Sequence, residues 1–344
     1  MHPLQPTGDA ARDVELLREW LGREDEQRLV IETSGSTGRP KRVLLSRSAV
    51  LASVRASAAR IGTGRWVLAL PSSYVAGVQV ICRSLVAGHD PALSLDELAP
   101  GDCVSLVPTQ LHRALADGDL TAGLAQAHVA LLGGGPIDPD LRRRAEQAGV
   151  PVVATYGASE TAGGCVYDGY PLDGVGVVVG SDGRVRLGGP TVFDGYEDDP
   201  DLTAQALVDG WYLTSDAGRL DEDGRLQVLG RLDDVVVSGG VKVPLPAVAA
   251  TLRAHPGVEA AECVGLLDDE WGTRVVAVVV PSRVISPAAG TTAPSLDSLR
   301  DHVAAAHPRA WAPRAVVVVE AIPLLAHGKV DRRALEELAS GATG

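Results

Sequence analysis

The chain has 344 residues, long enough for two domains, and its 31 lysines and arginines against 44 aspartates and glutamates give a formal net charge of −13. Hydrophobic residues make up 45% of the chain and charged residues 22%, which is the balance of a folded protein and excludes wholesale disorder. The acidic balance and the aromatic content of 3% argue against a nucleic-acid-binding protein, which needs clustered cations and stacking rings.

The first two thirds of the chain predict alternating strands and helices. Apolar residues at helical spacing over 11–21 predict an amphipathic helix. Strand-like apolar runs then alternate with helical stretches, which predicts stacked βα units, and these runs lie at 29–31, 43–45, 67–70, 104–107, 129–132 and 152–155. Over 175–229 the pattern changes to short runs separated by turn residues, which predicts antiparallel hairpins.

The last part of the chain predicts a small α+β unit. Its expected strands lie at 235–237, 260–267, 275–280 and 315–319, and its expected helices at 247–254, 296–306 and the C-terminus. The predicted organisation is a large α/β domain with an antiparallel β portion over 1–230, a hinge at 231–234 and a small mobile α+β domain over 235–344. The stretch 281–294, rich in Pro, Ala, Thr and Gly, predicts a mobile loop.

The cysteines and the N-terminus carry no sign of a metal site or of export. Four cysteines are scattered without a CxxC pair, so we expect them to pack in the core: Cys82, Cys103, Cys165 and Cys263. The N-terminus lacks the basic start and apolar stretch of a signal peptide, and no apolar run approaches about 18 residues. We therefore expect a cytoplasmic chain with reduced thiols and no membrane insertion.

The segment TSGSTGRPK at 33–41 directly follows the predicted strand at 29–31. Its small residues let backbone N–H groups close around an anion, its hydroxyls add donors, and Lys41 adds a positive charge. Composition alone would also suit a flexible Ser/Gly turn. The glycine spacing, and the absence of Ser or Thr after Lys41, distinguish the segment from a nucleotide P-loop. The segment predicts a loop that cradles phosphate groups.

This loop resembles the signature of the adenylate-forming enzymes, which include acyl-CoA synthetases, luciferases and peptide-synthetase adenylation domains. Further segments match the family in order: LPSSYVAG at 70–77, GGGP at 133–136, YGASET at 156–161, WYLTSD at 211–216, GRLDD at 230–234, SGG at 238–240 and GKVD at 328–331. An ordered series of this length is far more specific than any one segment. The resemblance implies the adenylate-forming enzyme fold and the cofactors ATP, Mg²⁺ and coenzyme A.

The resemblance also implies how ATP is bound. It implies contacts to ATP by the phosphate loop, the adenine-side segments and a ribose pair: Thr33, Ser34, Gly35, Ser36, Thr37, Gly38, Lys41, Gly133, Gly134, Gly135, Tyr156, Gly157, Ser159, Asp216 and Arg231. Glu160 offers the hard oxygen that Mg²⁺ requires, and Thr37 and Glu160 are implied to be catalytic. Taken singly, such residues also suit a solvated glutamate, a βα turn or a surface ion pair.

A two-step reaction is implied: a carboxylate attacks the α-phosphorus of ATP and expels pyrophosphate, and a thiol then attacks the acyl-adenylate and expels AMP. Lys329, from the second domain, is implied to balance charge in the first step. Rotation about Asp233 would then withdraw Lys329 and bring Gly239 and Gly240 to the tunnel of the pantetheine arm.

The chain also resembles the short o-succinylbenzoate-CoA ligases of menaquinone synthesis, in residues 156–173 and 238–246. The implied contacts to the acid are Tyr74, Gly77, Arg83 and Thr161. Arg83 could pair the second carboxylate of that acid or lie on a helix surface. Tyr74 stands where the family usually has histidine.

The phosphate loop starts nearer the N-terminus than is usual in the family, so one side of the acid pocket or a dimer surface could be altered. Two alternatives to the ligase remain: an adenylating enzyme that loads an aryl or amino acid onto a carrier protein, and a non-enzymatic nucleotide-binding module. The expected partners are the small-molecule acid, ATP and CoA, with no nucleic acid and with a homodimer left open.

Overall fold

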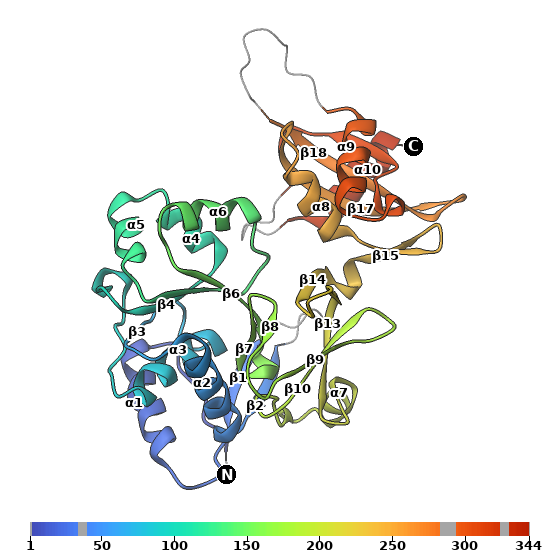
Figure 1. Cartoon of the computed structure of the whole chain (residues 1–344). Coiled ribbons are helices and arrows are strands. Elements are labelled where there is room, and N and C mark those ends of the chain that lie inside the picture. Colours follow the sequence, from blue (N-terminus) through green and yellow to red (C-terminus); the bar gives the residue numbers. More distant parts are fainter. Residues whose placement is uncertain (1, 34–39, 283–293, 324–329, 344) are drawn as a thin grey trace. The chain divides into compact units, whose positions relative to one another are not determined.

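The structure is a computed structural model that describes residues 2–33, 40–282, 294–323 and 330–343 (Figure 1). The chain folds into two compact units. The first comprises Met1–Thr214 with Leu220–Gln227, and the second Ser215–Arg219 with Val228–Gly344. The residues of the expected hinge, 231–234, belong to the second unit. Rotation of the small domain about this hinge stays a prediction.

The first unit begins with the predicted amphipathic helix, α1 (Ala10–Gly22). Asp9 caps it, because its side chain accepts a hydrogen bond from the backbone N–H of Arg12. One face buries Val14, Leu17 and Trp20 in the core. The predicted helix is confirmed.

A six-stranded sheet forms the centre of the first unit, in the order β3-β4-β5-β6-β7-β8. The strands are β3 (Trp66–Val67), β4 (Cys103–Leu106), β5 (Val129–Leu132), β6 (Val152–Ala158), β7 (Gly163–Tyr167) and β8 (Tyr170–Pro171). Strands β3 to β6 run parallel, as the predicted βα units require, while β7 and β8 join antiparallel.

Helices cover both faces of this sheet (Figure 1). They are α2 (Arg47–Ile61), α3 (Val75–Val86), α4 (Pro108–Ala114), α5 (Gly118–Ala125) and α6 (Pro139–Gln147). Along β5, Val129 and Leu131 pack with α1, α2 and α3, whereas Ala130 and Leu132 pack with α4, α5 and α6. Both faces are buried because successive side chains of a strand point to opposite sides.

The strands β1 (Leu29–Thr33) and β2 (Lys41–Leu45) differ from the prediction. They pair antiparallel with each other, and β11 (Gly195–Tyr196) adds to β2 in a separate three-stranded sheet. A parallel crossover needs a dozen or more residues, and the connection over 34–40 is too short for one. The apolar runs were located correctly, but their assignment to stacked βα units was wrong.

The hairpins expected over 175–229 are confirmed in a five-stranded sheet of the order β12-β13-β10-β9, with β14 paired to β13. Its strands are β9 (Gly176–Val179), β10 (Arg184–Gly188), β12 (Leu207–Val208), β13 (Trp211–Leu220) and β14 (Leu226–Arg231). The helix α7 (Pro200–Ala206) precedes β12. The 3₁₀ turns η1 (Leu95–Glu97) and η2 (Ser159–Thr161) belong to the first unit, whereas Ser215–Arg219 of β13 and the part of β14 from Val228 onward belong to the second.

The second unit has a sheet of the order β16-β15-β18-β17, with β19 parallel to β18. Its elements are η3 (Leu232–Asp234), β15 (Val235–Ser238), β16 (Val241–Pro244), α8 (Leu245–Arg253), β17 (Val258–Asp268), β18 (Gly272–Pro281), α9 (Leu296–Ala306), η4 (Arg309–Trp311), β19 (Ala315–Val318) and α10 (Arg332–Thr343). The α+β prediction is confirmed, with β16 missed because Lys242 and Pro244 interrupt its apolar pattern. Most of the predicted loop at 281–294 lies outside the described residues.

No helix among the described residues combines the length and the apolar character needed to cross a membrane.

Candidate active site

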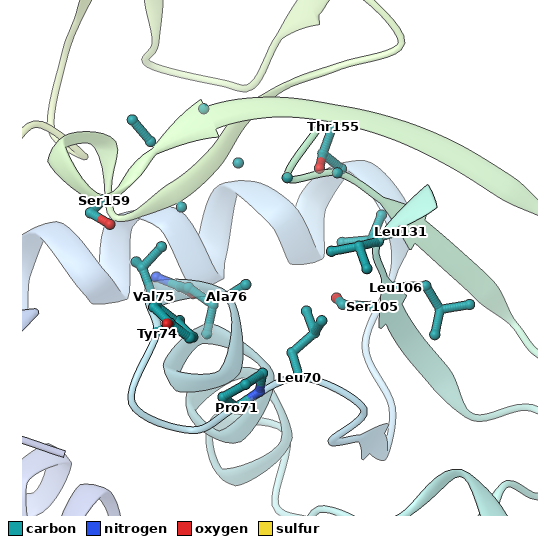
Figure 2. A pocket seen from close by; sticks show the side chains of 18 of the residues that line it. Leu70, Pro71, Tyr74, Val75, Ala76, Ser105, Leu106, Leu131, Thr155 and Ser159 are labelled. Carbon is teal, nitrogen blue, oxygen red and sulfur yellow. The ribbon is translucent and has the colours of Figure 1, made fainter. Parts of the chain in front are cut away.

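The first unit contains a cavity of about 580 Å³ at the carboxyl ends of the parallel strands β4, β5 and β6. Ligands of α/β proteins bind at this edge because the loops that follow the strands converge there. Figure 2 shows Leu70, Pro71 and Tyr74 on one side of the cavity, with Ser105 and Leu131 from the sheet. Most of the lining is apolar, and a volume of this size suits a small organic molecule.

The predicted acid-binding segment lies where β3 leads into α3. Five of its residues line the cavity: Leu70, Pro71, Tyr74, Val75 and Ala76. Tyr74 is 55% exposed. Gly77 lies in the first turn of α3 and is not among the lining residues, and its contact with the acid stays a prediction. A Cβ at Gly77 would lie 2.2 Å from the carbonyl oxygen of Pro71, which explains why glycine is needed here.

We expect Gly77→Ala to lower the free energy of unfolding by about 2 to 3 kcal/mol, because the new methyl group must push the Pro71 backbone away from α3. Gly22→Ala is the matched control, since a Cβ there meets nothing within 4 Å. We expect the control to change stability by less than about 0.5 kcal/mol. Urea unfolding of both variants makes the comparison, and equal stabilities would contradict the steric explanation.

Arg83 is buried, with 7% exposure, and it lines the cavity from the last turn of α3. Its Nη2 donates to the hydroxyl of Tyr167 at 3.2 Å, and its guanidinium lies 5.0 Å from the ring of Trp66. Its buried Nε has no hydrogen-bond partner, and none of the described carboxylates pairs with it. The helix-surface alternative for Arg83 is therefore wrong. Burying a cation with an unpaired donor costs free energy unless an anion accepts its hydrogen bonds and balances its charge.

Several residues predicted to bind the nucleotide line the same cavity as residues predicted to bind the acid. Gly133, Gly134, Gly157 and Ser159 all line it, together with Tyr74 and Arg83. Gly135 is exposed and outside the lining, and Tyr156 packs partly buried against the core. Their contacts with adenine stay predictions.

Thr161 is not among the residues that line the cavity, and its contact with the acid stays a prediction. Its side chain is fully buried, and its Oγ1 accepts a hydrogen bond from Ala158 N at 2.9 Å and donates to Gly163 O at 2.8 Å. The hydroxyl therefore closes the turn between β6 and β7.

Glu160 lies in this turn and is held by a tyrosine that sequence reasoning missed. Its carboxylate is buried, and its Oε1 accepts a hydrogen bond of 2.8 Å from the hydroxyl of Tyr196 on β11. Burial, with the nearby charge of Glu160, raises the pKa of Tyr196 well above its usual value, so the phenol stays a neutral donor. The ammonium of Lys41 lies 5.4 Å from the ring of Tyr196.

Lys41, Tyr196 and Glu160 thus form a contiguous set, which we call the Tyr196 cluster. Strand β11 pairs with β2 here, and this pairing brings the end of the predicted phosphate loop next to the predicted metal ligand. The separation of 36 positions between Glu160 and Tyr196 hid this contact from the sequence.

The remaining predicted site residues are not among the described residues that line this cavity, so the cavity does not test their predicted roles. Thr33 ends β1 opposite Lys41. Asp216, Arg231, Asp233, Gly239 and Gly240 belong to the second unit. Ser34, Gly35, Ser36, Thr37, Gly38 and Lys329 lie outside the described residues. The roles of all these residues stay predictions.

The cysteines offer no nucleophile to the site. All four are buried and free, and burial raises the pKa of the Cys82 and Cys165 thiols to about 12. Thiols with such a pKa stay protonated near neutral pH and are poor nucleophiles. The described residues also contain no group of three or more His, Cys, Asp or Glu side chains that could hold a metal.

Comparisons with known proteins agree with this architecture. The family model described as "AMP-binding enzyme" matches residues 19–196, and that of the "AMP-binding enzyme C-terminal domain" matches residues 247–329. The chain is 41% identical to "Probable 2-succinylbenzoate--CoA ligase" of Mycobacterium tuberculosis H37Rv, over 91% of this chain and 84% of the relative. It is 33% identical to the 2-succinylbenzoate–CoA ligase of Geobacillus kaustophilus, over 76% of this chain and 61% of the relative.

Two solved structures have the same fold. Apo MatB from Rhodopseudomonas palustris matches with a TM-score of 0.77 and 24% identity, over 92% of this chain and 68% of that one. The o-succinylbenzoate CoA synthetase MenE from Bacillus subtilis, in complex with the acyl-adenylate intermediate OSB-AMP, matches with a TM-score of 0.72 and 25% identity, over 90% and 68%.

Proposed function

The chain belongs to the family of AMP-binding enzymes, and we propose that it is an AMP-forming acid–CoA ligase that acts on 2-succinylbenzoate, an intermediate of menaquinone biosynthesis. The observation that carries the choice of acid is the buried Arg83, which lines this largely apolar cavity and whose buried Nε has no hydrogen-bond partner. The names of the relatives support the same acid.

The proposed chemistry has two steps. The carboxylate attacks the α-phosphorus of ATP to form an acyl-adenylate and pyrophosphate. The thiol of CoA then attacks the acyl carbonyl, forms the thioester and releases AMP. No protein nucleophile is needed, because adenylation converts a poor leaving group into a good one, and the protein mainly positions the reactants and balances charge.

In this scheme the cavity orients the acid and excludes water from it. The apolar side chains of Leu70 and Leu131 would contact the aromatic ring, while Arg83 would bind the second carboxylate. Gly133 and Gly134 leave the backbone accessible to the adenylate at the strand ends. Lys41, held over Tyr196, would face the ATP phosphates at the end of the phosphate loop.

The donor set around Glu160 fits a magnesium ion that arrives with ATP. Glu160 is a single buried carboxylate, and among the described residues only Tyr196 donates a hydrogen bond to its carboxylate oxygens. Mg²⁺ in phosphoryl-transfer sites commonly has one or two carboxylate ligands and takes the rest from phosphates and water. When bound, the ion would neutralise charge on the phosphates. We place the enzyme in the cytoplasm, where ATP and CoA are available.

The proposal is tested by pyrophosphate release across a panel of carboxylic acids, followed by CoA consumption and identification of the thioester. We expect 2-succinylbenzoate to give the highest kcat/KM and to consume CoA. Preference for an amino acid or a simple aryl acid, with transfer only to a carrier-protein thiol, would instead identify a carrier-loading enzyme. ATP binding without pyrophosphate release for any acid would identify a nucleotide-binding module.

We expect Arg83→Ala to raise the KM for 2-succinylbenzoate about 10- to 100-fold, because it removes a charge-assisted hydrogen bond to the second carboxylate. The KM for a keto-monocarboxylate of similar shape should change little, so the two acids control for each other in the same variant. Steady-state pyrophosphate release gives both constants. An equal rise for both acids would remove Arg83 from the acid site.

A further inference from the structure

Asp13 is a buried carboxylate that connects the N-terminal segment with the acid-binding loop, although 59 positions of sequence separate it from Ser72 of that loop. The residue is 0% exposed and lies in the first turn of α1. Its Oδ1 accepts hydrogen bonds from the Thr7 N–H at 2.7 Å and the Thr7 hydroxyl at 2.9 Å. Its Oδ2 accepts from the Gly8 N–H at 2.9 Å and from the Ser72 hydroxyl at 2.6 Å.

Four donors therefore converge on one carboxylate, and no cation of the described residues pairs with it. Burial by itself raises the pKa of Asp13, but the hydrogen bonds, led by that from Ser72, lower it below its usual value. The group stays ionised in the folded protein. Hydrogen bonds to an ionised acceptor are stronger than those between neutral groups, so the hydrogen bond from Ser72 to Asp13 is a strong one.

Ser72 lies between two residues that form one side of the cavity. Pro71 and Tyr74 line it, and Ser72 itself is buried, with 2% exposure, and points away to Asp13. The N–H of Tyr74 donates to the carbonyl of Pro71 at 3.1 Å, which makes the loop a tight turn. Gly77 of α3 packs close to the Pro71 backbone, since a Cβ there would lie 2.2 Å from the Pro71 carbonyl oxygen.

The N-terminal segment that holds Asp13 is fixed to β1. The N–H of Leu4 donates to the carbonyl of Arg28, and the N–H of Val30 donates to the carbonyl of Leu4, both at 2.8 Å. Strand β1 leads directly into the predicted phosphate loop. One short segment therefore connects the strand before the phosphate loop with the loop that carries Tyr74.

We propose that Asp13 is a positioning residue for the acid-binding site: by fixing Ser72, it holds Pro71 and Tyr74 at the cavity and so determines the affinity for the acid. This inference rests on the proposed function only in assuming that the cavity binds the carboxylic acid. It assigns Asp13 no contact with ATP, the acid or CoA.

The test compares Ser72→Ala with Thr7→Ala in the full chain. Each variant removes one hydroxyl donor from Asp13, but only Ser72 belongs to the acid-binding loop. We expect Ser72→Ala to raise the KM for the acid about tenfold and to leave the KM for ATP within about twofold. Thr7→Ala should leave both constants near those of the unaltered chain, with a similar loss of thermal stability.

Asp13→Asn extends the test. The amide has only one acceptor oxygen, so its N–H₂ group would face one pair of the donors that now bind the carboxylate, and those hydrogen bonds would be lost. We expect the acid KM to rise at least as much as in Ser72→Ala. The proposal is overturned if Ser72→Ala and Thr7→Ala have the same acid KM, or if the acid and ATP constants rise together. The acid used is the one that gives the highest kcat/KM with the unaltered chain. If that acid is not 2-succinylbenzoate, the proposed function is wrong, and the comparison of Ser72→Ala with Thr7→Ala still tests the role of Asp13.

Discussion

The Lys329→Ala variant is expected to form the acyl-adenylate about 100- to 1000-fold more slowly than the unaltered enzyme. The resemblance of GKVD at 328–331 to the family assigns this lysine to the first step, where its ammonium would balance the charge that develops between the attacking carboxylate and the α-phosphate. The second step should proceed at a nearly normal rate, because we expect the lysine to have left the site by then.

The two half-reactions separate these expectations. Adenylation is followed by pyrophosphate release in the absence of CoA, and thioester formation by supplying the acyl-adenylate together with CoA. An equal loss in both half-reactions would contradict the assignment of Lys329 to adenylation alone and the alternation of the two domains about Asp233.

We expect Glu160→Gln to lower the rate of adenylation about 100-fold and to raise the Mg²⁺ concentration needed for half-maximal rate. The amide keeps the size of the side chain and can still accept a hydrogen bond from Tyr196, but it lacks the negative charge that would attract the ion. The measurement is pyrophosphate release at saturating ATP and acid over a series of Mg²⁺ concentrations.

Tyr196→Phe is the matched control for this effect. It keeps the ring beside the Lys41 ammonium and the packing against Phe193, and it removes only the hydroxyl that holds Glu160. We expect a loss of about tenfold or less, since the carboxylate remains but is less well oriented. If Glu160→Gln were no worse than Tyr196→Phe, and the Mg²⁺ requirement were unchanged in both, Glu160 would not be the metal ligand.

The parts of the fold that follow from local pattern could be predicted from the sequence. The strand at 129–132 and the helix at 296–306 coincide with β5 and α9, because a short apolar run or a helical spacing specifies each of them. The pairing of β1 with β2 could not be read in this way, since apolar runs do not encode their partners. The length of the connection over 34–40 was the signal that favoured a hairpin.

The residues of the site also fall into those that the sequence could predict and those that it could not. Ordered motifs identified residues that do line the cavity, such as Tyr74 and Ser159. Asp13 and Tyr196 were missed because each acts through one long-range hydrogen bond, to Ser72 and to Glu160, which has no periodicity in the sequence. For Arg83, the sequence left a helix-surface position and an acid-binding position equally open, and burial against Trp66 decided between them.

The most direct test of the account is a crystal structure of the chain with AMP and 2-succinylbenzoate, or with the acyl-adenylate they form. We predict the aromatic acid in the cavity with its second carboxylate on Arg83, the phosphate near Glu160, and the purine beside Tyr156 and the segment 133–135. A purine bound far from Tyr156, or an acid bound outside the cavity with Arg83 still lacking an anion, would contradict it.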